Sequence, residues 1–121
     1  MSILNRFRKI AETEFFDAIL SSEFIYDAPH LIEPSRLRLY LHDGSFIDVR
    51  YDEDEDEYSF HWQRDDKITR FNNAPHHRVK TFPRHIHLDS ESNVVDDDVT
   101  SPALSPEENF KRILRWIINR M

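Results

Sequence analysis

Hydrophobic and polar residues repeat with two different periods along the chain, and each period predicts one kind of element. Residues 3 to 24 repeat apolar side chains at helical spacing, with no Gly or Pro before Pro29, which predicts one helix. Near the other end, Ser105 as N-cap, Pro106 at the first helical position and Glu108 predict the start of a second helix. The apolar stripe of this second helix consists of Phe110, Ile113, Leu114 and Ile117.

Between these helices the apolar residues recur at every second position, which is the period of a β-strand. Residues 36 to 51 alternate around an Asp-Gly pair and therefore predict a hairpin. A two-residue turn would pair Leu39 with the charged Asp48, whereas a three-residue loop at 42 to 44 pairs Leu39 with Ile47. We therefore predict the three-residue loop, with the only glycine of the chain at its left-handed position.

Two more alternating segments, residues 57 to 63 and 67 to 72, flank a short charged turn and predict a second hairpin. With the two aspartates of the turn at the loop centre, His61 lies opposite Arg70. Both residues belong to the polar face of this hairpin, and the aromatic residues point to the other face.

A short stretch at residues 85 to 89 can add a fifth strand, in which His85 and His87 would point to the same side. The chain therefore predicts an α+β fold in a single domain of residues 1 to 121. This fold has an N-terminal helix, four to five antiparallel strands and a C-terminal helix. Both helices are expected on the apolar face of the sheet, which leaves the polar face open to solvent or a ligand.

Composition agrees with one folded domain and restricts its chemistry. The 121 residues are 39% hydrophobic, which suffices for one core. Cysteine is absent, so disulfides and thiolate sites are excluded, and any metal must be bound by His, Asp or Glu. The N-terminus is not typical of a signal peptide, and no apolar run reaches the ~20 residues of a membrane span. We therefore expect a cytoplasmic protein with no membrane partner.

Charge is distributed unevenly along the chain. The net charge of -7 is unusual for a nucleic-acid-binding protein, but much of the negative charge lies in residues 51 to 59 and 89 to 98. Both stretches are expected to be solvated loops. Between them the chain is locally basic, with Arg64, Lys67, Arg70, Arg78, Lys80 and Arg84 against Asp65 and Asp66.

Five of the seven histidines fall within this basic part of the chain or at its border. Single histidines are more often inert surface residues than functional ones, but the predicted strands would gather these five at one edge of the sheet. A zinc site could use His85 and His87 together with His76 or His77, although the nearby arginines would repel a dication. The five residues are His61, His76, His77, His85 and His87.

Metal-free cleavage of RNA could use the same side chains, because it needs a base, an acid and cations on the phosphate. His76 is the candidate base and His85 or His87 the candidate acid, since Pro75 and Pro83 stiffen the backbone just before each cluster. Aromatic side chains could stack on unpaired bases, although single aromatics more often only pack. His61 and Arg70 are the expected phosphate ligands, and the expected substrate-binding residues are Asn72, Asn73, His77, Arg84, Tyr40 and Tyr58.

Four motifs occur in an order and spacing that resembles the TumE family of toxins. They are LHDGSFIDV (41–49), YSFHW (58–62), RFNNAPHH (70–77) and TFPRHIH (81–87). The resemblance implies a toxin of a prokaryotic type II toxin-antitoxin pair, neutralised by a helix-turn-helix antitoxin and acting on RNA. The family pattern has an Asp where this chain has Asn72, and often a His where it has Arg84. Asn72 can donate and accept hydrogen bonds but cannot take up a proton, and Arg84 is a cation without acid or base capacity.

Three hypotheses follow from these observations. The leading one is a metal-independent ribonuclease toxin that needs no cofactor. A non-catalytic binding or regulatory module is favoured by the overall acidity and by Asn72 in place of the family Asp. A metal-dependent hydrolase with histidine ligands is the third.

Overall fold

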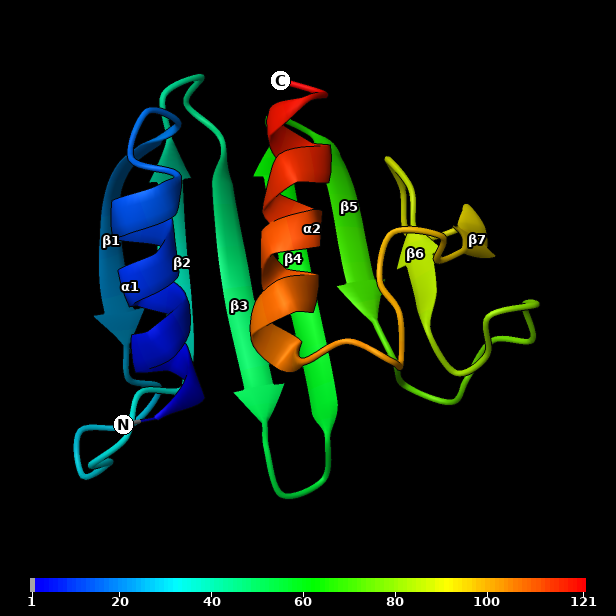
Figure 1. The fold of residues 1–121 in the computed structure, drawn as a ribbon, viewed down its shortest axis with the longest axis horizontal. Coiled ribbons are helices and arrows are strands. Elements are labelled where there is room, and N and C mark those ends of the chain that lie inside the picture. Colours follow the sequence, from blue (N-terminus) through cyan, green and yellow to red (C-terminus); the bar gives the residue numbers. More distant parts are fainter. Residues whose placement is uncertain (1) are drawn as a thin grey trace.

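The protein folds into a seven-stranded antiparallel sheet with two helices on one of its faces (Figure 1). The computed structural model describes residues 2–121. Each strand pairs with the next one along the chain, so the order in the sheet is the order in the sequence. The elements are α1 (Ile3–Glu14), β1 (Ile19–Ile25), β2 (Arg36–Leu41), β3 (Phe46–Asp52), β4 (Glu57–Arg64), β5 (Lys67–Asn72), β6 (His85–His87), β7 (Val94–Asp96) and α2 (Pro106–Ile118).

One hydrophobic core lies between the helices and the sheet, as the alternation of the strands predicts. Phe7 of α1 stacks on Phe110 of α2, with 4.4 Å between the ring centroids. The predicted start of α2 is confirmed, because the Ser105 side chain accepts a hydrogen bond from the backbone N–H of Glu108. All four residues of the predicted apolar stripe of α2 are buried.

The predicted length of the N-terminal helix is wrong. α1 ends at Glu14, and Ile19–Ile25 form strand β1 on the edge of the sheet beside β2. The pairing of β1 shifts between Ile19 and Ser21, which leaves Leu20 between them 62% exposed. This irregularity removes the two-residue period from the segment, so its apolar residues continue the helical spacing of the preceding residues in the sequence.

The predicted number of four to five strands is also wrong, because β1 and β7 add to the five that the alternation predicts. β7 lies inside the acidic stretch at 89 to 98 that was expected to be a loop. It has only three residues, and it pairs with β6 at the edge of the sheet.

The predicted registers of both hairpins are confirmed. In the first hairpin Leu39 pairs with Ile47, and Gly44 has a φ of 90°, the left-handed value that an L-residue rarely adopts. In the second, His61 pairs with Arg70. These registers determine which side chains meet on the face away from the helices.

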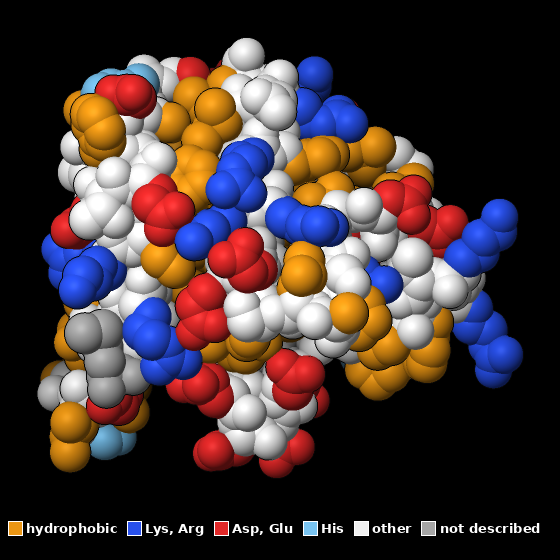
Figure 2. Space-filling view, in the orientation of Figure 1, with side chains coloured by type: hydrophobic (Ala, Val, Ile, Leu, Met, Phe, Trp, Pro, Cys, Tyr) orange, Lys and Arg blue, Asp and Glu red, His pale blue; other side chains and the backbone are white. Residues whose placement is uncertain are grey.

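The helix-bearing face shows where the negative charge gathers (Figure 2). Acidic side chains cluster on the loop between β3 and β4, whose residues 52 to 57 are exposed, as expected for a solvated loop. Within residues 2–121, neither helix has the length and apolar composition needed to cross a bilayer.

Candidate functional site

Ionisable side chains form one row across the helix-free face of the sheet. Arg38 of β2 pairs with Asp48 of β3, which in turn pairs with His61 of β4. Next along the row, Arg70 of β5 lies between His61 and His87 of β6. Paired residues of neighbouring strands point to the same face, so these side chains lie side by side across five strands.

A groove of about 410 Å³ lies over this row on strands β2 to β5. Its lining contains three arginines and one carboxylate, so the lining itself is net positive. Two carboxylates outside the lining pair with it: Asp27 contacts Arg50 at 3.2 Å, and Glu91 contacts Arg70 at 2.8 Å. The lining residues are Arg36, Phe46, Asp48, Arg50, Ser59, His61 and Arg70.

Asp48 holds Arg36 of the lining and the neighbouring Arg38 against the sheet. Its carboxylate accepts hydrogen bonds from Arg36 Nη1 at 2.8 Å and from Arg38 Nε and Nη2 at 2.8 and 2.9 Å. These bonds raise the pKa of Arg38 further above its already high value, although burial acts in the opposite direction. Asp48 is only 8% exposed and both of its oxygens are engaged, so it positions cations rather than exchanging protons.

The hydrogen bonds of His61 indicate which of its ring nitrogens donates and which accepts. Arg70 Nη2 lies 3.3 Å from His61 Nδ1, and a guanidinium can only donate. His61 Nδ1 therefore accepts, and His61 Nε2 carries the proton that it donates to Gln63 Oε1 at 3.1 Å. In this arrangement both ring nitrogens of His61 have a partner, Nδ1 in Arg70 and Nε2 in Gln63.

Beyond Arg70, three histidines pack against one another. His85 and His87 point to the same side of β6, as predicted, and are 1% and 5% exposed. His77, from the loop before β6, is half-buried and covers both, with ring centroids 4.8 and 5.1 Å from theirs. Burial lowers the pKa of His85, electrostatic interaction with the neighbouring imidazoles of His87 and His77 lowers it further, and a hydrogen bond with the Pro83 carbonyl opposes these effects. We call His77, His85 and His87 the histidine triad.

His76 lies apart from the triad, although it is adjacent to His77 in sequence. It is exposed and lines a second pocket of about 650 Å³, together with Asn72 and Asn73. Arg50 and Ser59 line both this pocket and the groove, so the two hollows adjoin. The predicted base is thus accessible at one end of the groove.

The two asparagines of this pocket shape the loop that carries His76. Asn72 Oδ1 accepts a hydrogen bond from the Ala74 backbone N–H at 3.1 Å. Asn73 Oδ1 accepts from the Tyr58 backbone N–H at 3.0 Å, and Asn73 Nδ2 donates to the Asp56 carbonyl at 2.6 Å. These side chains hold the start of the loop in place next to the sheet.

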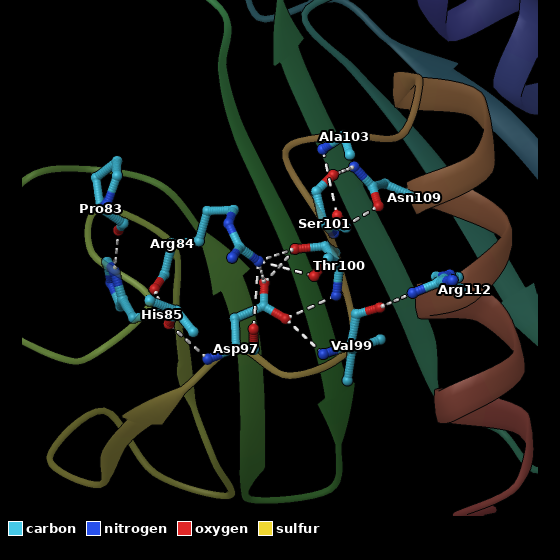
Figure 3. Close-up of polar contacts among 11 residues, drawn as sticks. Pro83, Arg84, His85, Asp97, Val99, Thr100, Ser101, Ala103, Asn109 and Arg112 are labelled. Carbon is cyan, nitrogen blue, oxygen red and sulfur yellow. Dashed lines mark hydrogen bonds and ion pairs between the residues drawn. The ribbon is translucent and has the colours of Figure 1, made fainter.

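Arg84 is not among the residues that line the groove, and its side chain points toward Asp97 and Thr100 instead (Figure 3). Its Nη1 donates to the Thr100 carbonyl at 2.8 Å and to the Thr100 hydroxyl at 3.0 Å, and lies 3.9 Å from Asp97 Oδ2. Asp97 is 1% exposed and also accepts from the backbone N–H groups of Val99 and Thr100. Arg84 therefore anchors the segment that leads toward α2 and is not placed to bind a phosphate with Arg70.

The two tyrosines predicted to stack on bases lie on opposite faces. Tyr58 points to the helix-bearing face, where its ring centroid is 5.4 Å from that of Phe60 and 5.7 Å from that of Tyr51. Tyr40 is on the open face beside the groove, and its hydroxyl donates to Glu23 Oε1 at 2.6 Å. The structure thus leaves only Tyr40 beside the groove.

Comparison with protein families explains why these motifs occur together. The model of the family described as toxin TumE matches residues 10–121, which is nearly the whole chain. The chain belongs to the TumE family. All of the residues described above lie within the matched part, and membership makes the chain the toxin component of a toxin-antitoxin system, with an antitoxin as its partner. Comparisons with curated proteins and with solved structures give no match.

Several residues of this candidate site were not predicted from the sequence. Arg36, Arg50 and Ser59 line the groove, and strand alternation could have placed them there. Glu91, which pairs with Arg70, lies in the loop between β6 and β7, and no period in the sequence indicates that contact.

Proposed function

We propose that this toxin cleaves single-stranded RNA in the cytoplasm, with the RNA backbone bound along the groove on the open face of the sheet. The main observation in support is the set of three arginines that line the groove over strands β2 to β5, next to the exposed His76. Guanidinium groups bind phosphate oxygens through paired N–H donors, and their charge favours a polyanion.

A phosphate can displace the carboxylates that now pair with the groove. Asp27 and Glu91 have half-exposed side chains, so their ion pairs with Arg50 and Arg70 are weak in water. Asp48, in contrast, is buried and keeps its arginines aligned. Binding of RNA would exchange two exposed ion pairs for contacts with successive phosphates.

Base stacking can add affinity next to the phosphate contacts. Phe46 lines the groove, and the guanidinium of Arg38 lies 4.2 Å from its ring centroid. Tyr40 pairs with Phe46 across the two strands. These two rings offer an unpaired base a surface that tolerates any sequence.

The proposed chemistry is attack of the RNA 2′-oxygen on the adjacent phosphorus, with loss of the 5′-oxygen and no metal ion on the phosphate. His76 would take up the 2′-hydroxyl proton, and Arg70 with the Nε2–H of His61 would stabilise the charge on the phosphate. The general-acid role of His85 or His87 stays a prediction. Both imidazoles are buried, so either would reach a phosphate only after His77 moves aside.

Cleavage of a labelled single-stranded RNA by the purified toxin, in the presence of EDTA, tests the proposal. His76→Ala should lower the rate by about 10²- to 10⁴-fold, the usual contribution of a general base. His42→Ala, a change at an exposed histidine in the β2–β3 turn, is the matched control and should cleave like the parent. Binding of RNA by the folded parent without any cleavage would support the non-catalytic binding module instead.

A further inference from the structure

The histidine triad brings three imidazoles from two separate segments to one point. His85 and His87 come from β6, and His77 comes from the loop before it. One ring nitrogen from each residue lies within 4.8 Å of those of the other two. The role proposed for the groove and for His76 does not explain why three titratable imidazoles pack against one another in a largely buried position.

The hydrogen bonds of His85 and His87 determine which nitrogen of each ring carries the hydrogen. His85 Nδ1 lies 2.9 Å from the Pro83 carbonyl oxygen, and His87 Nδ1 lies 2.9 Å from the Glu91 carbonyl oxygen. Carbonyl oxygens only accept, so both Nδ1 atoms carry a hydrogen. A neutral imidazole has one N–H, so in the neutral rings each Nε2 presents a lone pair.

These two lone pairs face each other. His85 Nε2 and His87 Nε2 are 3.2 Å apart, a distance at which two acceptors repel unless a positive centre lies between them. Two nitrogens bound to one tetrahedral zinc ion at 2.0 to 2.1 Å are about 3.3 Å apart. The spacing in β6 therefore fits two ligands of one metal ion.

The surroundings resemble those of metal-bound histidines. Such histidines commonly donate the outer N–H to a backbone carbonyl, which orients the ring, and both His85 and His87 do so. The nearby cation Arg70 is paired with Glu91 at 2.8 Å, and the Glu91 carboxylate is 3.9 Å from His87 Nδ1. The pairing reduces the repulsion that Arg70 would exert on a dication.

We propose that His77, His85 and His87 bind one divalent transition-metal ion, with Zn²⁺ as the best fit. Three imidazoles without sulfur suit zinc and its neighbours in the first transition row rather than Mg²⁺ or Ca²⁺, which prefer oxygen ligands. A fourth tetrahedral position is left for a water molecule. The ion ties the loop that contains His76 to strand β6, because His77 is the next residue.

This inference stands on the geometry of the triad and does not depend on cleavage of RNA. It assigns the triad to metal binding in place of the predicted general-acid role of His85 or His87, whereas the proposed base His76 and the groove are outside the triad. Metal binding can therefore be measured on the purified toxin without RNA, and either proposal can fail while the other holds.

The experiment is equilibrium dialysis of the metal-free toxin against Zn²⁺, followed by elemental analysis, with Co²⁺ absorption as a report of geometry. The parent should retain about one Zn²⁺ per chain and give the intense visible bands of tetrahedral Co²⁺. At a free Zn²⁺ concentration of about 100 times Kd, the melting temperature should rise by roughly 10 °C.

Variants test which residues are the ligands. His77→Ala, at a half-buried loop position, and His87→Gln should each lose the bound Zn²⁺ and the Co²⁺ bands, with circular dichroism confirming the fold. His30→Ala and His42→Ala, at exposed positions, should bind like the parent. Absence of Zn²⁺ binding by the folded parent would overturn the inference, and so would a folded His77→Ala that binds as tightly as the parent. His77→Ala decides the matter if His87→Gln fails to fold.

Discussion

Replacing Asp48 with Ala should destabilise the protein because it leaves two arginines without their shared carboxylate. The side chain of Asp48 is 11% exposed, and those of Arg36 and Arg38 are 25% and 23% exposed. Loss of one partner from a buried ion pair costs about 3 to 5 kcal/mol. Because both guanidiniums keep some contact with water, we expect a smaller loss in the free energy of unfolding, about 2 to 3 kcal/mol.

Urea denaturation followed by circular dichroism measures this loss. With an m-value of about 1.5 kcal/mol/M, the midpoint should fall by roughly 1.3 to 2 M. The matched control is Asp27→Ala, which removes an ion pair with Arg50 whose side chains are 47% and 50% exposed. That change should cost at most about 1 kcal/mol. Equal midpoints for the two variants would refute the view that Asp48 organises the groove.

Two further predictions concern pH and the partner. Burial raises the pKa of Tyr58 to about 12, so the unfolded chain loses this proton first and stability should fall as the pH rises above about 10. Tyr58→Phe should flatten that dependence in thermal melts at pH 9 to 11, and an unchanged slope would contradict the assignment. We also propose that the antitoxin is a helix-turn-helix protein that covers the basic edge around Arg70 and Arg78 with acidic or aromatic groups. Arg78→Glu should then weaken co-purification with the antitoxin, and a complex formed wholly on α1 and α2 would exclude this mode of inhibition.

The sheet could be predicted where strands alternate regularly and turns have a strict conformational demand. Only a left-handed residue closes the first hairpin in the register that buries Leu39 and Ile47, and Gly44 meets that demand. β1 was not predicted because its pairing shifts at Leu20, so its apolar residues do not recur at every second position. β7 has only three residues, and they form a strand because β6 offers them a free edge.

The alternation of the strands also predicts which residues form the centre of the candidate site. It could have excluded two of the residues that were predicted to belong to it. His61, Arg70, His85 and His87 point to one face, as their spacing predicts. Arg84 directly precedes His85, and Tyr58 lies three positions before His61, so the two-residue period puts both on the other side. The contact between Glu91 and Arg70 joins a loop to a strand, and only the folded chain brings them together.

Cleavage of RNA by groove variants tests the central claim most directly. Arg70→Met keeps an unbranched side chain close to the length of the aliphatic part of Arg but removes the guanidinium that contacts His61. Arg120→Met, at an exposed position beyond α2, is the matched control for loss of one positive charge. With purified, folded proteins and one single-stranded RNA, we expect the first variant to lose cleavage by about 10²-fold or more and the second to cleave like the parent. Cleavage by Arg70→Met at the rate of the parent would contradict the claim that the open face of the sheet is the active surface.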